Sequence, residues 1–342
     1  MRKKVIEYFH DCSNSLLKES VPHRALVAIY LFDFLDRLRQ ENFPSDWFER
    51  MKQEMGEVNK LASILATHFD NTPDIDNAWE EDEKIQSIEY KTGNVYFQLW
   101  QNFTKNEYYQ KTKELLKHRL SRNNLKISDF QNGLDAGCGG GRYTLALRSM
   151  GIKRMQGIDI SPDSITLASK MNGFEENEVS FKQASVLDLP FDDESYDFVF
   201  SNGVLHHTTS TSKGLSELYR VLQPGGEGWL YLYGGKESLF WDIVDFCRKI
   251  LSQVSQSYMQ ILMKVLGYPP GRIFHRVDFW YVPINNRYFY SEVASMLSDA
   301  GFSNHRKLLR GADIDWDEII HNNKRIDPYI YGEGEMRFWI TK

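Results

Sequence analysis

The hydrophobic and polar positions divide the chain into regions with different periods. Residues 1–70 carry apolar side chains at helical spacing, first over 26–35 and then along 46–69, and Pro44-Ser45 separates the two stretches. Neither stretch alternates as a strand does, and neither holds a catalytic constellation. We therefore expect residues 1–87 to form an all-helical N-terminal extension that serves as a cap or a dimerisation element.

From residue 131 the pattern changes to short apolar strands that alternate with helices. The predicted strands cover 133–136, 155–160, 179–186, 196–201 and 229–233, with helices over 142–150, 162–173 and 213–222. A further helix over 291–300 precedes two closing strands at 303–309 and 336–341. This alternation predicts an α/β fold with a doubly wound sheet of seven strands and helices on both faces. We place this domain at residues 88–342.

Three segments interrupt these patterns. Residues 236–286 form a predicted helical insertion after the fifth strand, with helices over 239–251 and 258–266 and then an irregular stretch rich in aromatic and arginine residues. The aromatic segment 90–100 contains Gly93 and Asn94, which predict a loop. Residues 104–107 have capping-box spacing and predict a helix that runs to 122, whereas the acidic run 80–83 predicts a solvated linker.

Composition narrows the classes of function. The 342 residues carry a net charge of −6, which disfavours nucleic acid as the main partner because phosphate binding needs a basic surface. Cys12, Cys138 and Cys247 are widely spaced and suggest a reducing compartment, and no Cys/His spacing predicts a metal site. We see no signal peptide and no apolar run long enough to cross a bilayer, so we expect a cytoplasmic protein without membrane attachment.

The strongest chemical signal is a glycine turn after the first predicted strand. Gly137, Gly139 and Gly141 follow Asp135 and precede a helix, so the turn offers close backbone approach and free N–H groups. A dinucleotide fingerprint would place its third glycine at 142, where the chain has Arg142. An acid at 135 would repel a pyrophosphate but would tolerate an ammonium or a sulfonium. The turn therefore favours a cationic, amino-acid-bearing ligand over NAD.

Two further acids follow the next two predicted strands. Asp159 ends the second strand, where a carboxylate can accept both hydroxyl groups of a ribose. Asp188 follows the third strand, where it could accept a hydrogen bond from an adenine amino group. Open α/β sheets bind ligands at the carboxyl edge of their strands, and all three acids are predicted to lie there.

These residues resemble a known family. The segment 133–235 is similar to class I S-adenosylmethionine-dependent methyltransferases, which have a Rossmann-like fold, of the type that acts on small molecules. The resemblance rests on motifs in the order and spacing of that family, namely LDAGCGGG at 134–141, GIDIS at 157–161, DLPF at 188–191, YDFV at 196–199, VLHH at 204–207 and RVLQPGG at 220–226. It covers about a third of the chain strongly, and residues 1–85 and 236–286 lie outside it.

The resemblance implies S-adenosyl-L-methionine as cofactor, with S-adenosyl-L-homocysteine as product, and it implies roles for matching residues. The methionine part would be held by Asp135, Gly137 and Gly139, the ribose by Asp159, and the adenine by Val186, Leu187 and Asp188. Asn202 and Leu205 would lie beside the sulfonium, and Gly141 and Ile160 complete the implied set. We add Tyr96 and Arg142 as cofactor contacts, because an aromatic face stabilises a sulfonium and an arginine pairs with a carboxylate. Packing onto the sheet is an equal alternative for Tyr96.

Methyl transfer requires alignment of the acceptor and, for some acceptors, removal of a proton. His206 and His207 follow the fourth strand, so either could act as a general base or only position the loop. Acceptor specificity is predicted to come from the extension and from 236–286 as a substrate lid, with Trp100, Arg272, Arg276 and Tyr281 as contacts for a small acceptor. A helix pair that supports a homodimer is the alternative for this insertion.

We thus expect a methyltransferase that acts on an oxygen or nitrogen atom of a small molecule. An RNA- or protein-directed methyltransferase and a non-catalytic cofactor-binding protein remain alternatives, and a dehydrogenase is a weaker one.

Overall fold

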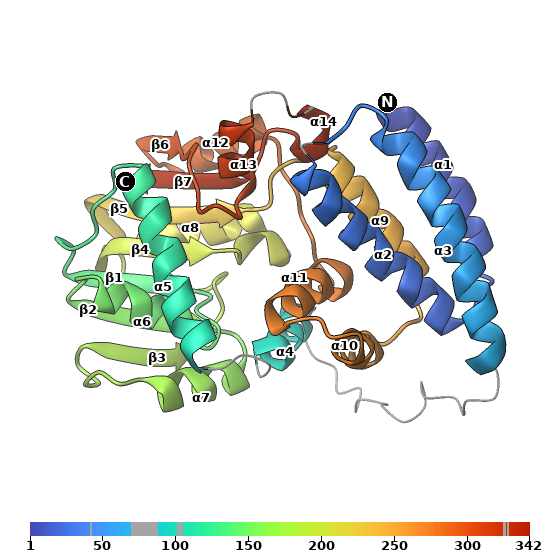
Figure 1. The fold of residues 1–342 in the computed structure, drawn as a ribbon. Coiled ribbons are helices and arrows are strands. Elements are labelled where there is room, and N and C mark those ends of the chain that lie inside the picture. Colours follow the sequence, from blue (N-terminus) through green and yellow to red (C-terminus); the bar gives the residue numbers. More distant parts are fainter. Residues whose placement is uncertain (42, 70–87, 101–104, 324–325, 327) are drawn as a thin grey trace. The chain divides into compact units, whose positions relative to one another are not determined.

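A computed structural model describes residues 1–41, 43–69, 88–100, 105–323, 326 and 328–342 (Figure 1). The chain forms two compact units, each assembled from segments that are far apart in the sequence. The first unit, called the helical unit here, contains residues 1–85, 237–281 and 325–332. The second unit, called the sheet unit, contains residues 86–236, 282–324 and 333–342.

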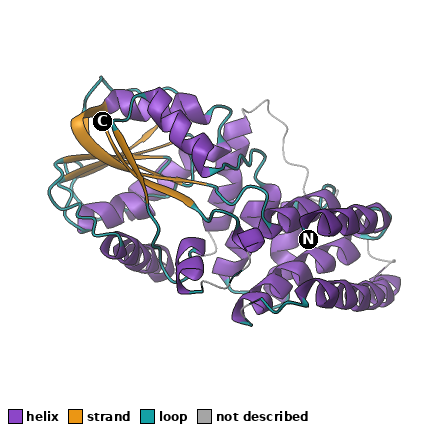
Figure 2. Cartoon of the chain, turned by 90° about the horizontal axis from the view of Figure 1, so that it is seen from above, coloured by secondary structure: helices purple, strands orange, loops and turns teal. Residues whose placement is uncertain are grey.

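The sheet unit is built on one seven-stranded sheet with the order β3-β2-β1-β4-β5-β7-β6. Its strands lie side by side in Figure 2, with helices on both sides. The first five strands are parallel, and β7 runs antiparallel to both of its neighbours. The strands are β1 (Asn132–Ala136), β2 (Arg154–Asp159), β3 (Val179–Gln183), β4 (Tyr196–Asn202), β5 (Leu222–Leu232), β6 (Asn304–Lys307) and β7 (Met336–Thr341). This confirms the predicted doubly wound, Rossmann-like sheet.

Alternation along the strands creates a core on each face of the sheet, because successive side chains point to opposite sides. On one face, Phe198 and Phe200 of β4 pack with Trp229 and with helices α5 (Lys105–Arg122) and α6 (Arg142–Ser149). On the other face, Val199 packs with Leu230 and with helices α8 (Thr211–Val221) and α12 (Tyr290–Ala300). The strands are therefore covered on both sides, as a parallel sheet requires.

Among the described residues, the sheet unit also contains three further helices and one short turn. They are α4 (Ile88–Trp100), α7 (Pro162–Met171), α13 (Trp316–Asn322) and the 3-10 turn η2 (Leu205–His207). Helix α7 begins as its sequence predicts, because the Ser161 hydroxyl accepts a hydrogen bond from the Ser164 N–H and Pro162 occupies the first turn. The turn η2 follows β4 and places its two histidines just beyond that strand.

The helical unit joins the N-terminal extension to the insertion after β5. Its helices are α1 (Arg2–Leu16), α2 (Val21–Gln40), α3 (Trp47–Phe69), α9 (Leu239–Ile250), α10 (Gln256–Val265), α11 (Pro270–Tyr281) and α14 (Pro328–Tyr331). Phe9 of α1 stacks on Phe246 of α9 with ring centroids 4.6 Å apart, and the Arg24 guanidinium donates to the Ile250 carbonyl. The described residues of the predicted extension and of the predicted insertion are mainly helical, as expected.

Two local predictions were wrong. The segment with Gly93 and Asn94 is not a loop but continues helix α4. The stretch predicted to be irregular forms helix α11, which starts at Pro270 as an N-terminal proline allows. Residues 224–226 lie within β5, where Gly225 has φ +74° and the register shifts between Tyr196 and Phe198 of β4. The capping residue Thr104 and the acidic linker 80–83 lie outside the described residues.

Candidate functional site

The glycine turn lies between β1 and α6, at the carboxyl edge of the sheet. Gly137, Gly139 and Gly141 have φ angles of +87°, +52° and +82°, which L residues with a side chain rarely adopt. A Cβ on Gly137 would lie 2.4 Å from both Cγ atoms of Val204. The turn thus needs glycine both for its backbone angles and because Val204 leaves no room for a Cβ atom. The first N–H groups of α6 lie at the carboxyl edge of the sheet, where they have no partner within the helix.

Asp135 lies at the end of β1 and is buried, with 2% of its surface exposed. The Thr144 hydroxyl of α6 donates a 2.6 Å hydrogen bond to its Oδ2 atom. Burial raises the pKa of Asp135 to about 7; the hydrogen bond from Thr144 opposes this rise, and the negative charge of Asp159 reinforces it. A cation bound nearby would favour the ionised form of this carboxyl group.

Asp159 ends the neighbouring strand β2 and connects the two turns at this edge. Its Oδ2 atom accepts a 2.9 Å hydrogen bond from the Gly139 N–H, and its Oδ1 atom accepts one of 2.9 Å from the Ser161 N–H. Burial raises the pKa of Asp159, although these backbone hydrogen bonds oppose the change. A carboxylate offers about four lone pairs, so Asp159 keeps capacity to accept a further hydrogen bond from a hydroxyl group.

The remaining predicted cofactor residues take up different positions. Val186 is buried in the core, with Leu187 packed against it, and Asp188 is exposed in the turn that follows β3. The guanidinium carbon of Arg142 lies 5.7 Å and 5.2 Å from the ring centroids of Tyr108 and Tyr143. The structure therefore brings Asp135, Asp159 and the glycine turn together, and places Ile160 directly after Asp159.

Asn202 and Leu205 lie at the end of β4 with different surroundings. The Asn202 side-chain oxygen accepts a 2.9 Å hydrogen bond from the Trp229 indole N–H, which fixes the orientation of the amide. Leu205 is completely buried in the core, and a Cβ on Gly214 would lie 2.6 Å from one of its methyl groups. The Leu205 side chain therefore packs beneath the edge with α8.

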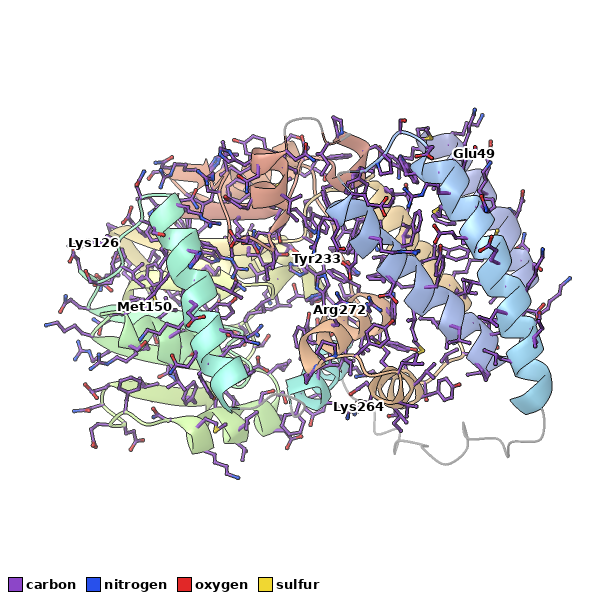
Figure 3. The ribbon with its side chains drawn as sticks, in the orientation of Figure 1. Glu49, Lys126, Met150, Tyr233, Lys264 and Arg272 are labelled. Carbon is purple, nitrogen blue, oxygen red and sulfur yellow. The ribbon has the colours of Figure 1, made fainter. Side chains whose placement is uncertain are left out.

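His206 is fully buried and stacks on Tyr233, the residue after β5 that Figure 3 labels. The two ring centroids are 3.8 Å apart, and the His206 Nδ1 atom accepts a 3.2 Å hydrogen bond from the Tyr233 N–H. Burial lowers the pKa of His206 well below its usual range, and His207 lowers it further. The ring is therefore neutral with its proton on Nε2, and this nitrogen has no hydrogen-bond partner in the part of the chain that the structure describes.

His207 lies between two hydrogen-bond partners from distant parts of the sequence. Its Nδ1 atom is 2.7 Å from the Ile284 carbonyl oxygen, and its Nε2 atom is 2.8 Å from the Tyr96 hydroxyl. Only 4% of the His207 surface is exposed. Tyr96 and His207 were both candidate site residues in the sequence. No sequence pattern indicated that they form a pair, or that Tyr233 and Ile284 contact the histidines.

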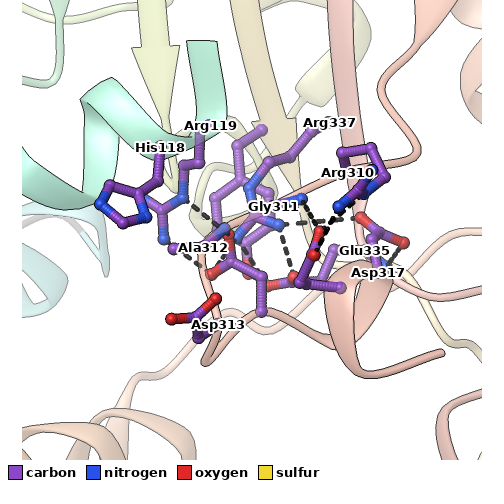
Figure 4. Close-up of polar contacts among 12 residues, drawn as sticks. His118, Arg119, Arg310, Gly311, Ala312, Asp313, Asp317, Glu335 and Arg337 are labelled. Carbon is purple, nitrogen blue, oxygen red and sulfur yellow. Dashed lines mark hydrogen bonds and ion pairs between the residues drawn. The ribbon is translucent and has the colours of Figure 1, made fainter. Parts of the chain in front are cut away.

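A buried cluster of charges lies at the same end of β5 and β7 (Figure 4). Arg119 of α5 makes two hydrogen bonds, of 2.7 Å and 2.8 Å, to the carboxylate of Asp315. Arg337 of β7 contacts Asp315 at 3.2 Å and also hydrogen-bonds Glu335. Burial opposes ionisation of Asp315, but Arg337 and Arg119 hold its pKa well below its usual range.

The acids of this cluster do not all behave alike. Burial, reinforced by the charge of Glu335, raises the pKa of Asp317 to about 8, and burial also raises the pKa of Glu335. Tyr231 of β5 packs its ring 4.5 Å from the Arg337 guanidinium and donates a hydrogen bond to Glu335. Tyr231 also pairs with Asn202 of β4 in the sheet. Through Tyr231, the buried charges therefore stabilise the carboxyl ends of β4 and β5. No pattern in the sequence indicates this cluster.

The predicted acceptor contacts Arg272, Arg276 and Tyr281 all belong to the helical unit. Arg272 is exposed on α11 (Figure 3). Arg276 is 2% exposed, and its Nη2 atom lies 2.6 Å from Asp33 and 3.5 Å from Asp36. Its charge is thus paired within this unit. The side chain of Trp100 lies outside the described residues.

Other classes of site find little support in the described parts of the chain. The described His, Cys, Asp and Glu residues form no group of three that could hold a metal ion. None of the described helices has the length and apolar character that a bilayer crossing requires. All three cysteines are free.

The strand order, the glycine turn and the two buried acids at one edge together define a Rossmann-like domain for a nucleoside-bearing cofactor. Residues 134–230 match the model of the methyltransferase domain family. The chain therefore carries a class I S-adenosylmethionine-dependent methyltransferase domain.

Curated relatives with several kinds of acceptor share this domain. The chain is 30% identical over 138 residues to O-methyltransferase cnsE of Penicillium expansum, covering 39% of this chain and 49% of the relative. It is 30% identical over 102 residues to a tRNA U34 carboxymethyltransferase of Campylobacter curvus, covering 30% and 34%. It is 32% identical over 120 residues to phosphoethanolamine N-methyltransferase 2 of Caenorhabditis elegans, covering 32% and 27%. The match spans half or less of each relative, so it identifies the domain and not the acceptor.

Proposed function

We propose that this protein transfers the methyl group of S-adenosylmethionine to an oxygen or nitrogen atom of a small molecule. The observation that carries the proposal is the meeting of Asp135, Asp159 and the glycine turn at one sheet edge, within the segment that matches the methyltransferase family. The cofactor would supply an activated methyl group on a cationic sulfur.

The residues present fit this cofactor. Asp135 would face the cationic methionine part, and the free lone pairs of Asp159 would accept hydrogen bonds from the ribose hydroxyl groups. The backbone of the glycine turn admits close approach because it carries no Cβ atoms there. Val186, Leu187 and Asp188 would surround the adenine. Beyond this, the chain has to orient the acceptor, exclude water and remove a proton where the acceptor carries one.

Titration calorimetry tests cofactor binding directly. We expect S-adenosylmethionine and S-adenosylhomocysteine to bind and NAD to give no heat. Asp159→Ala should weaken binding more than tenfold, or about 1.4 kcal/mol, through loss of the ribose contacts. Asp163→Ala, at an exposed position in the first turn of α7, is the matched control and should leave the affinity unchanged. An unchanged Kd for Asp159→Ala would refute the assignment.

The acceptor can be sought with methyl-labelled cofactor. The protein is incubated with fractionated metabolite extract, with total RNA and with protein extract, each before and after nuclease or protease treatment. Label in a small, nuclease-resistant product supports the proposal. Label that disappears with nuclease would instead support an RNA acceptor, the second candidate, which the tRNA-modifying relative favours and the net charge of −6 disfavours. Tight cofactor binding without transfer to any fraction would indicate a non-catalytic binding protein.

We also propose a cytoplasmic location, which the three free cysteines support because a reducing compartment keeps thiols in this state.

A further inference from the structure

The turn after β3 carries Asp188 and is held from two sides. On the first side, the Ser185 carbonyl accepts a 3.2 Å hydrogen bond from the Asp188 N–H, and the Ser185 hydroxyl oxygen accepts one of 3.1 Å from the Leu187 N–H. On the second side, the turn meets helix α8, which comes later in the chain. Asp188 therefore lies between two anchors, and only the first of them is local in sequence.

Two side chains of α8 make the second anchor. The Glu217 carboxylate accepts a 2.7 Å hydrogen bond from the Leu189 N–H, and Arg220 Nη2 donates one of 2.9 Å to the Leu189 carbonyl. The other terminal nitrogen of Arg220, Nη1, donates a 2.7 Å hydrogen bond to the Phe191 carbonyl. Both backbone polar groups of the residue after Asp188 are thus bound by side chains of one helix, and the planar guanidinium reaches two carbonyls at once.

This anchor is itself fixed in place. Glu217 and Arg220 are three positions apart on α8, so they lie on one face of the helix. Arg220 donates two hydrogen bonds, of 2.9 Å and 2.8 Å, to the Glu217 carboxylate, and these charge-assisted bonds lower the pKa of Glu217. The buried side chains of Leu215 and Leu218 pack α8 onto the core of the sheet. The two charged residues therefore present a rigid pair of groups to the turn.

Asp188 depends on such support more than the other two acids of the cofactor edge. The carboxylates of Asp135 and Asp159 each accept hydrogen bonds from neighbouring groups, which fix their orientation. The carboxylate of Asp188 is exposed, and it has no hydrogen-bond partner in the parts of the chain that the structure describes. Its position is therefore determined by the backbone of the turn, which the two anchors hold.

We propose that Glu217 and Arg220 are positioning residues that determine the affinity for the adenine part of the cofactor, an inference that rests on the proposed cofactor site. Neither side chain touches the cofactor in this role. They hold the backbone at Leu189 and thereby place the Asp188 carboxylate where it would accept a hydrogen bond from the adenine amino group. The sequence motif that begins at Asp188 and the one that begins at Arg220 then act as one functional unit, although they are separate along the chain.

A double-mutant cycle with S-adenosylhomocysteine as the ligand tests this role. Calorimetry gives the Kd for the full-length wild type, for Asp188→Ala, for Arg220→Lys and for the double variant. Lysine keeps the positive charge but lacks the planar fork that reaches both carbonyls, so Arg220→Lys should weaken binding about fivefold to tenfold. In the Asp188→Ala background the same substitution should change the Kd by less than about twofold, because no carboxylate is left to position. A purely structural loss would weaken binding by the same factor in both backgrounds.

Glu217→Ala provides a second variant and should show the same dependence on Asp188. Ser216→Ala, at an exposed position of the same helix where the hydroxyl donates to the Ser212 carbonyl, is the matched control and should leave the Kd unchanged. An unchanged Kd in Arg220→Lys or in Asp188→Ala, or equal weakening in both backgrounds, would overturn the positioning role. Failure of the wild type to bind S-adenosylhomocysteine would instead overturn the proposed function, so the wild-type titration separates the two failures. Thermal melting of each variant confirms that it is folded.

Discussion

The raised pKa of Asp135 makes cofactor affinity depend on pH. In the free protein this buried carboxyl group has a pKa of about 7, so it is mostly protonated below that pH. A sulfonium and an ammonium bind better to the ionised form, and binding at low pH must therefore expel a proton. The affinity for S-adenosylmethionine should consequently fall as the pH decreases from 7.

The size of this effect follows from the fraction of ionised Asp135. With a pKa of about 7, the free protein has about half of its Asp135 ionised at pH 7 and about 3% at pH 5.5. The expected loss of affinity is thus about 15-fold, or about 1.6 kcal/mol, and the ammonium of the cofactor stays charged throughout because an α-amino group titrates near 8.

Calorimetry at pH 5.5, 6, 6.5 and 7 measures this dependence, and buffers with different ionisation enthalpies report the expelled proton. Asp135→Asn should bind more weakly at pH 7 and lose most of the slope. In the wild type, the 2.6 Å hydrogen bond from Thr144 lowers the pKa of Asp135. Thr144→Val removes this bond, so the pKa of Asp135 should rise and the loss of affinity should begin at a higher pH. A Kd that changes less than twofold over this range, or an unchanged slope in Asp135→Asn, would refute the reasoning.

Three further predictions concern stability. Gly137→Ala should lower the free energy of unfolding by about 2–4 kcal/mol, because the residue has positive φ and its new Cβ would meet Val204. Gly225→Ala also has positive φ but open space around it, so it should cost only about 1–2 kcal/mol. Equal denaturation midpoints for the two variants would contradict this. Arg119→Met leaves the buried Asp315 without its bidentate partner and should cost about 3–5 kcal/mol in urea unfolding, while Asp313→Asn at the exposed pair with Arg122 should cost less than about 1 kcal/mol. Asp317 has a pKa of about 8 in the native state and near 4 in the unfolded chain, so the native state binds a proton that the unfolded chain has lost. The free energy of unfolding should therefore fall from pH 6.5 to 8, by up to about 1.4 kcal/mol per pH unit. Asp317→Asn should flatten this slope, and an equally steep profile in the variant would exclude Asp317 as its source.

The fold could be predicted because its signals are local. The apolar strands, the glycine turn and the Ser161-Pro162 helix start each lie within a few neighbouring residues, and the seven-stranded sheet follows from their order. Helix α4 was missed because Gly93 usually weakens a helix. Here a side chain at 93 would meet Ser161 at 3.1 Å, a contact that only the folded chain reveals.

The cofactor edge was predicted better than the rest of the site. Asp135 and Asp159 follow adjacent strands, so their meeting required only the order of the strands. The Tyr96–His207 pair joins residues 111 positions apart, and the Arg119–Asp315 pair joins residues 196 apart. No periodicity records such pairings, because they depend on how helices and loops return to the sheet. The roles of Arg272, Arg276 and Tyr281 in acceptor binding stay predictions.

The composition of the helical unit from three separated segments has a consequence for folding. Arg2 pairs with Asp242 across 240 positions, and Tyr329 hydrogen-bonds the same carboxylate. During synthesis, the N-terminal helices must wait for α9 and then for α14 before their partners exist, and meanwhile buried positions such as Val27 and Leu31 remain exposed to water. Contacts so distant in sequence slow folding, since long loops must close first. A fragment that stops before residue 332 would complete neither unit, so shortened versions of this chain should aggregate rather than fold.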